Sequence, residues 1–314
     1  MRYKFIFLFI TLLGWLALPA RADSTGAQQV APGIKPANAT IPQRGTLFRV
    51  QYQNHTCYLF GTVHIGQADF YPLEPQVMQA FASADRFTLE VDMRDTASLQ
   101  SAARKYGVYA AADGLDKHLS PAALAQLKAY ISHAGISFDS IVRMKPWMAA
   151  NFLLLTMLEG QGYHSDLGTE TYLLNAAVSQ HKAIAEMETA DSQLSLFAAL
   201  TEKQQEQYLI DNLDELQSGE AIRKARELVN AWGSSDQKAL DGLLREAQQD
   251  KTMSGKFFIK VLLNQRNPEM AAKVATLLKQ DQVSFVGVGL LHLLGNNGVP
   301  SLLARRGYQV TRLY

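Results

Sequence analysis

The pattern of apolar and polar residues predicts strands near both ends of the chain and helices in its middle. Apolar runs at 47–50 and 57–60 flank a polar turn at 53–55, which is typical of a β-hairpin. A helix at 74–84 and a strand at 86–91 follow. Farther along, apolar residues recur every three or four positions, the spacing of a helix, in the segments 122–133, 148–159, 170–180, 202–216, 221–232 and 236–248.

The end of the chain repeats the order of elements found near its start. An apolar run at 284–288 is followed by a short helix at 299–306 and a strand at 308–313. Near both ends a strand leads into a Gly-x-x-His motif, Gly61-Thr62-Val63-His64 and Gly289-Leu290-Leu291-His292, before a loop, a helix and another strand. The sequence therefore predicts an α/β fold. Its central sheet is mixed and largely parallel, is built from two βαβ units, and carries a large helical insertion at about 97–280 with one short strand at 183–185.

The two motifs and one glutamate form a candidate site. In an open α/β sheet, ligands bind at the carboxyl ends of the parallel strands. His64 and His292 follow such ends, and Glu90 lies at the end of the strand at 86–91. A glutamate at an apolar strand end must be paired, bound to a cation or protonated. Two imidazoles and one carboxylate can hold a divalent transition metal with positions left for water, so we expect the three residues to share one pocket as metal ligands or catalytic groups.

Each of these residues also has a structural interpretation. A histidine near a strand end is commonly a buried, hydrogen-bonded residue, and a glutamate there often pairs with an arginine or caps a helix. The single cysteine, Cys57, lies in an apolar run, so we expect a buried strand residue rather than a nucleophile. A shared site is favoured by the recurrence of the motif at equivalent strand ends.

The first 22 residues have the layout of a secretory signal peptide. Arg2 and Lys4 precede an apolar run at 5–19, and Ala20-Arg21-Ala22 forms an Ala-x-Ala cleavage site. An uncleaved anchor is the alternative, but a spanning helix needs about 20 apolar residues. We expect cleavage after Ala22 and a bacterial periplasmic or secreted protein, with a flexible lead-in at 23–45 before a folded domain at 46–314.

Composition narrows the range of partners. The chain has 314 residues, 30 Lys and Arg against 29 Asp and Glu, and 47% hydrophobic residues, as in globular proteins. This near-neutral balance predicts no nucleic-acid partner, because phosphate binding needs a concentrated basic patch. No apolar segment after residue 22 is long enough to span a membrane. A single cysteine excludes an internal disulfide, and the oligomeric state stays open.

Seven short motifs occur along the chain in a fixed order. They are Gly61-Thr62-Val63-His64, Leu89-Glu90-Val91-Asp92, Lys145-Pro146-Trp147, Gly168-Thr169-Glu170, Met187-Glu188-Thr189, Arg266-Asn267 and the closing segment at 286–295. In this order and spacing they resemble the TraB/GumN family, which is related to the Tiki metalloproteases, over roughly residues 46–314.

The resemblance implies an α/β fold with a helical insertion and, by analogy with Tiki proteins, metal-dependent peptide hydrolysis through His64, Glu90 and His292. Glu170, Glu188 and Arg266 match further family positions, for which it implies a place beside the metal ligands or facing the substrate. A structural role for these three is the alternative. Where the family often has a small residue after the glycine of the second motif, this chain has a leucine, which changes the expected shape of the pocket.

Three functions are compatible with these observations. The first hypothesis is an exported metal-dependent hydrolase that acts on peptide or protein substrates through a divalent transition metal. The second is a metal-independent, esterase-like hydrolase, in which His64 or His292 is the general base that activates water. The third is a non-catalytic protein that binds haem or a small ligand in the same pocket, with the two histidines as axial ligands.

Overall fold

One sheet of six strands runs through the part of the chain that the computed structural model describes, residues 43–314. Its strand order is β4-β3-β5-β2-β1-β6. Neighbouring strands from β4 to β2 are parallel, whereas β1 runs antiparallel to β2 and to β6, so the predicted mixed, largely parallel sheet is confirmed. The strands are β1 (Leu47–Tyr52), β2 (His55–Thr62), β3 (Arg86–Leu89), β4 (Ala183–Glu186), β5 (Val283–Gly289) and β6 (Gln309–Arg312).

β5 lies inside the sheet and joins the two ends of the chain. A parallel strand that is covered on both faces has a nearly continuous apolar sequence, and β5 is buried from its second residue to its last. It pairs with β2 on one side and with β3 on the other. The predicted hairpin is also present, with Tyr52 paired to His55 across a turn at Gln53 and Asn54.

Helices make up most of the chain between β3 and β5. The predicted helices are present, with their ends shifted by one or two residues. Five further α-helices of the described residues, α2, α3, α7, α11 and α12, lie outside the predicted segments, although α12 buries Met270, Val274 and Leu278 at helical spacing. The α-helices are α1 (Pro75–Ser83), α2 (Thr96–Gly107), α3 (Leu115–His118), α4 (Pro121–His133), α5 (Pro146–Gly160), α6 (Thr169–Ser179), α7 (Ala190–Ala198), α8 (Glu202–Ser218), α9 (Glu220–Gly233), α10 (Gln237–Gln249), α11 (Met253–Phe257), α12 (Asn267–Gln280) and α13 (Val299–Arg305). A π-helix, η3 (Phe258–Gln265), joins α11 to α12, and 3-10 turns are η1 (Ala68–Phe70), η2 (Phe138–Ser140) and η4 (Leu290–Leu293).

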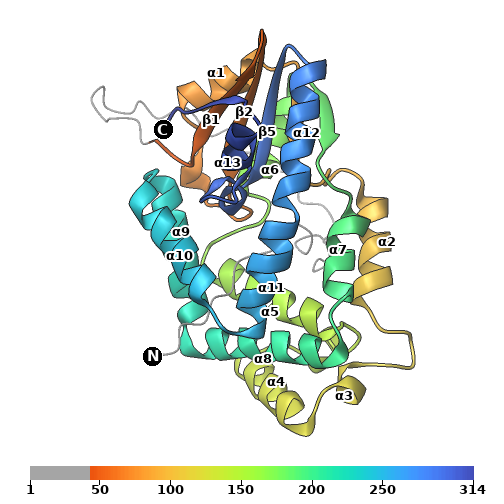
Figure 1. The fold of residues 1–314 in the computed structure, drawn as a ribbon. Helices are drawn as coiled ribbons and strands as arrows, with labels where there is room; N and C mark the ends of the chain where they lie inside the picture. Colours follow the sequence, from red (N-terminus) through yellow and green to blue (C-terminus); the bar gives the residue numbers. More distant parts are fainter. Residues whose placement is uncertain (1–42) are drawn as a thin grey trace, which may run out of the picture.

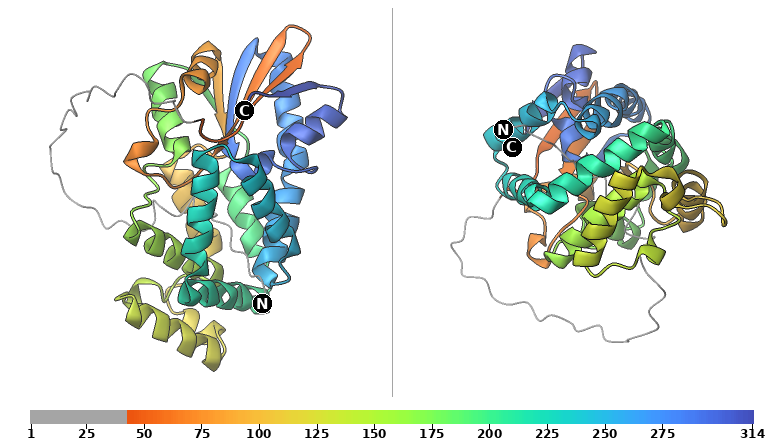
Figure 2. Two further views of the ribbon diagram at one scale, coloured as in Figure 1. Left: turned by 90° about the vertical axis from the view of Figure 1, so that its left-hand side faces the viewer. Right: turned by 90° about the horizontal axis from the view of Figure 1, so that it is seen from below.

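Two hydrophobic layers hold helices against the faces of the sheet. On one face, Phe81 of α1 lies edge-on to Phe87 and Phe285, with ring centroids 5.5 and 5.3 Å apart. On the other face, α12 and α13 pack against Leu59 and Val286. The sheet occupies one end of the molecule, and α3, α4, α5 and α8 occupy the other (Figure 1). The side view in Figure 2 shows the same division.

Other sequence predictions concern the chain outside the candidate site. Cys57 is a buried strand residue, as expected, and burial raises the pKa of its thiol to about 12, so the thiol stays protonated at neutral pH. Within residues 43–314, no helix combines the length and apolarity that a membrane crossing requires. The predicted signal peptide at 1–22, and the lead-in up to residue 42, lie outside the described residues.

Candidate functional site

Four adjacent strand ends bring four of the predicted site residues to one edge of the sheet. The last residue of β2, Thr62, pairs with Gly289 at the end of β5, and β3 and β4 end beside them. His64 follows β2, His292 follows β5 within η4, and Glu90 is the first residue after β3. The backbone N–H of Glu188, after β4, donates to the carbonyl of Glu90 at 2.8 Å. The parallel arrangement alone therefore gathers residues that are far apart in the sequence.

The two motif glycines let the two Gly-x-x-His segments touch each other. A Cβ on Gly61 would lie 2.8 Å from Leu290 Cδ1 and 3.2 Å from its Cα. A Cβ on Gly289 would lie 3.0 Å from Glu90 Oε1 and 3.2 Å from His64 Nε2. Each glycine thus makes room for the opposite half of the site, which is a physical reason for glycine at this point of both motifs.

The segment at 168–170 fixes the position of His64. The backbone N–H of Val63 donates to Thr169 Oγ1 at 2.8 Å. His64 Nδ1 lies 2.7 Å from Glu170 Oε1, which also accepts a hydrogen bond from the Thr62 hydroxyl. Burial opposes the protonation of His64, but the carboxylates of Glu170 and Glu90 outweigh it and raise the pKa of the imidazole. With Nδ1 against Glu170, the other ring nitrogen of His64 is left facing Gly289.

Gly168 lies directly against the backbone of His64, and its replacement tests this contact. In Gly168→Ala the new Cβ would lie 2.6 Å from the His64 carbonyl oxygen, so the backbone must move. We expect a loss of about 1–3 kcal/mol in the free energy of unfolding, measured by urea titration. Gly160→Ala is the matched control, because nothing lies within 4 Å of its Cβ position. Equal stability of the two variants would contradict the described packing.

His292 is a buried, neutral imidazole with both ring nitrogens occupied. Its Nδ1–H donates to Asn267 Oδ1 at 2.5 Å, and its Nε2 accepts a hydrogen bond from an Arg266 N–H at 3.2 Å. Burial and the adjacent guanidinium lower the pKa of His292 to about 3. His292 therefore presents a lone pair, not a proton, toward the site at neutral pH.

Arg266 links the carboxylates of the site. Its NH2 group donates to Glu90 Oε2 at 2.7 Å, and its Nε donates to the two oxygens of Glu188 at 2.9 and 2.8 Å. Glu90 and Arg266 are each only 2% exposed. Burial would raise the pKa of Glu90, but the guanidinium and both imidazoles, together with the Gly289 N–H, hold it well below its usual range. Glu90 is therefore a carboxylate throughout the physiological pH range.

All six predicted residues thus belong to one network of contacts, and three neighbours complete it. Asn267 orients His292, Thr62 contacts Glu170, and the side-chain amide of Gln193 donates to Glu90 Oε2 at 3.3 Å. Asn267 and Thr62 belong to the sequence motifs, although the sequence predicted no role for either residue. Gln193 carries no such signal, because only the position of α7 in the fold brings it to Glu90 and Glu188.

The donors of the site fit a divalent metal in their chemistry. His64 Nε2 and Glu90 Oε1 face the same point beside Gly289, and His292 Nε2 lies 3.9 Å from Glu90 Oε1. Glu170 and Asn267 hold the opposite ring nitrogens, as partners of metal-binding imidazoles do. Arg266 contacts two of these donor side chains, and among the described residues no three His, Cys, Asp or Glu side chains are grouped closely enough to share one ion. A metal shared by these donors would therefore require Arg266 and the donor side chains to move from the positions described.

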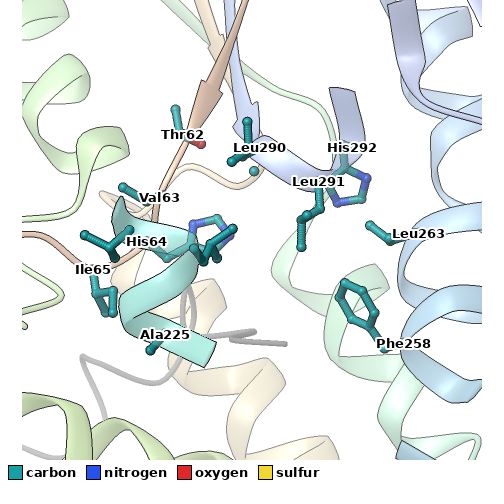
Figure 3. A pocket seen from close by; sticks show the side chains of 13 residues that line it. Thr62, Val63, His64, Ile65, Ala225, Phe258, Leu263, Leu290, Leu291 and His292 are labelled. Atoms are coloured by element: carbon teal, nitrogen blue, oxygen red, sulfur yellow. The ribbon is translucent and has the colours of Figure 1, made fainter. Parts of the chain in front are cut away.

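A mainly apolar pocket opens beside the two imidazoles. Figure 3 shows His64 and His292 flanking Leu290 and Leu291, with Phe258 on the side of His292. Helix α9 supplies one further wall of this pocket, and the π-helix η3 supplies another. The π-helix also places Arg266, which follows its last residue, against His292. The helical middle of the chain thus closes over the edge of the sheet where the site lies.

Comparison with known proteins places these features in a family. The sequence pattern of the TraB/PrgY/gumN family matches residues 46–312. The uncharacterized protein YbaP of Escherichia coli K12 and that of Shigella flexneri are each 26% identical to this chain over 250 residues, covering 80% of this chain and 88% of theirs. A metalloprotease TIKI homolog of Nematostella vectensis is 22% identical over 303 residues, covering 81% of this chain and 64% of its own. No solved structure shows significant similarity.

Proposed function

Because this chain belongs to the TraB/PrgY/gumN family, we propose that it is a hydrolase whose reaction takes place at His64, Glu90 and His292. The observation that carries the proposal is the convergence of two anchored imidazoles and one buried carboxylate beside an apolar pocket. The similarity to a metalloprotease TIKI homolog supports a peptide or protein substrate and a divalent transition metal.

In this proposal each residue of the chain has a defined task. His64 Nε2, His292 Nε2 and Glu90 would hold the metal, which supplies Lewis acidity that polarises a carbonyl and makes water a stronger nucleophile. Glu170 and Asn267 keep the imidazoles in one tautomer and orientation. Arg266 keeps Glu90 ionised. Glu90 can alternatively take the proton of the attacking water as a general base, and the apolar walls exclude bulk solvent.

Metal analysis tests this proposal directly. We expect the purified mature protein to bind about one divalent metal ion per chain, and the double variant His64→Ala/His292→Ala to lose it, because two of three ligands are gone. Peptide hydrolysis is expected to stop on exhaustive chelation and to return when the metal is added. His133→Ala, an exposed histidine at the end of α4, is the control. Full metal content in the double variant would exclude these ligands.

A second candidate, a metal-independent hydrolase, is favoured by the contacts of Arg266 and Glu170. Arg266 already occupies His292 Nε2, and the carboxylate of Glu170 raises the basicity of His64. His64 Nε2 would then accept the proton of water, and Glu170 would stabilise the resulting imidazolium. Hydrolysis that survives exhaustive chelation supports this candidate and contradicts the first. A haem-binding role has less support, because Glu90 and Arg266 lie in the space beside His292 Nε2.

We also propose that the chain is exported, with residues 1–22 removed and a single domain at 46–314 that carries its helical insertion at about 97–280. The support comes from the order of charged, apolar and small residues in the first 22 positions. Intact-mass measurement of protein from a bacterial periplasmic fraction is expected to give a chain that begins at Asp23. A full-length chain retained in the cytosol would contradict export.

A further inference from the structure

We propose that the pocket beside the imidazoles binds one aliphatic side chain of the substrate and that Ala225 and Leu291 set its size. This inference rests on the proposed hydrolase function. The pocket includes both His64 and His292 in its lining, so a side chain seated there lies next to the reacting groups. The chemistry of its walls and its volume then define which side chains it accepts.

The walls of the pocket favour an uncharged, apolar group. Of its thirteen lining residues in the described chain, none is Lys, Arg, Asp or Glu, and the polar members are Thr62 and the two histidines. A charged side chain that entered would lose its hydration without gaining a charged partner, which is unfavourable. An apolar side chain would instead be removed from water against leucine, valine and phenylalanine side chains.

The charges of α9 point away from the pocket. Arg223 pairs with Glu227 on the surface of the helix, and Lys224 pairs with Glu215 of α8. Ala225, Leu228 and Val229 of the same helix line the pocket instead. The helix thus carries charged residues, but its orientation directs only aliphatic side chains into the pocket.

Two lining residues control the size of the group that the pocket accepts. About 50 Å³ of the pocket is open to the centres of water molecules, so it holds a group larger than one water. A larger residue at Ala225 would narrow this space, and a smaller one at Leu291 would widen it. Leu290 is fixed by its contact with Gly61, but Leu291 is half-buried and Ala225 has the smallest side chain of the wall. These two positions are therefore the ones at which substitution tests the size of the pocket.

Cleavage of a peptide library with one varied position, read by mass spectrometry, tests the inference. The wild-type protein is expected to favour Leu, Ile and Val over Lys and Asp beside the cleaved bond by about 10-fold or more. Leu291→Ala should shift the preference toward Phe and Met, and Ala225→Leu should shift it toward Ala and Gly. Leu124→Ala, a half-buried leucine of α4 outside the pocket, should leave the preference unchanged.

A binding measurement separates this inference from the proposed function. N-acetyl-leucinamide should bind the wild-type protein, observed by NMR shifts of residues in the pocket, while N-acetyl-lysinamide should not. Ala225→Leu should weaken the binding of N-acetyl-leucinamide by about 10-fold or more, and melting curves report whether each variant is folded. Selective binding without any peptide cleavage would overturn the proposed function and retain the pocket assignment. Equal binding of both amides, or cleavage preferences that neither variant changes, would overturn the pocket assignment.

Discussion

His64→Ala is expected to lower kcat/KM for peptide hydrolysis by about 10²- to 10⁴-fold while the protein stays folded. His64 is the imidazole that both candidate mechanisms need, as a metal ligand or as the base that activates water. Its Nε2 faces the point beside Gly289 where Glu90 Oε1 also lies. Alanine removes the reacting nitrogen but leaves the hydrogen bond from the Val63 N–H to Thr169 Oγ1 intact.

Steady-state kinetics on the best substrate of a peptide library measure this effect, and His133→Ala provides the control. His133 is exposed at the end of α4, so the control variant should keep full activity. Far-ultraviolet circular dichroism and a melting curve establish that His64→Ala is folded. Activity within a few-fold of the wild type in a folded His64→Ala protein would exclude His64 from the reaction and with it both mechanisms.

Arg266→Met is expected to destabilise the fold by about 3–5 kcal/mol, the largest stability change among the proposed variants. Methionine keeps part of the side-chain volume but removes the cation that holds Glu90 and Glu188. Glu90 is 2% exposed, so its carboxylate would be left buried without its strongest partner. The cost arises from that uncompensated charge, because a buried ion pair contributes little net stability while it is intact.

Urea titration of Arg266→Met measures the loss, and two further variants define its cause. Arg86→Met removes an arginine that is 32% exposed and pairs with Asp281, so it should cost about 1 kcal/mol or less. Adding Glu90→Gln to Arg266→Met should recover part of the lost stability, since the buried negative charge is then absent. A double variant that is no more stable than Arg266→Met would show that the loss comes from packing and not from charge.

The local sequence predicted the strands, most helices and the residue types of the candidate site. Periodic apolar residues located the predicted helices to within one or two residues, because burial of one face is a local property of the sequence. The run at 284–288 predicted a buried strand for the same reason. The π-helix at Phe258–Gln265 was not predicted, since its hydrogen-bond shift has no distinct apolar period, and α12 was overlooked although its spacing is regular.

The candidate site was likewise predicted only in part from the sequence. The recurrence of Gly-x-x-His predicted that His64 and His292 would share one pocket, and Glu90 was singled out by its place at the apolar end of the strand predicted at 86–91. No spacing in the sequence indicated that Arg266 would bridge Glu90 to Glu188 and also contact His292. The preceding π-helix and the start of α12 give Arg266 this position, and both depend on helices packing over the sheet.

By itself, the sequence determined the strands, most helices, the paired motifs and the residue types that can do chemistry, because each depends on neighbours in the chain. Only the tertiary structure decided which of these residues touch, that Arg266 contacts both Glu90 and His292, and that the adjacent pocket is mainly apolar. The physical reason is that parallel pairing of β2, β3, β4 and β5 brings distant strand ends to one edge, and side-chain packing then fixes the distances.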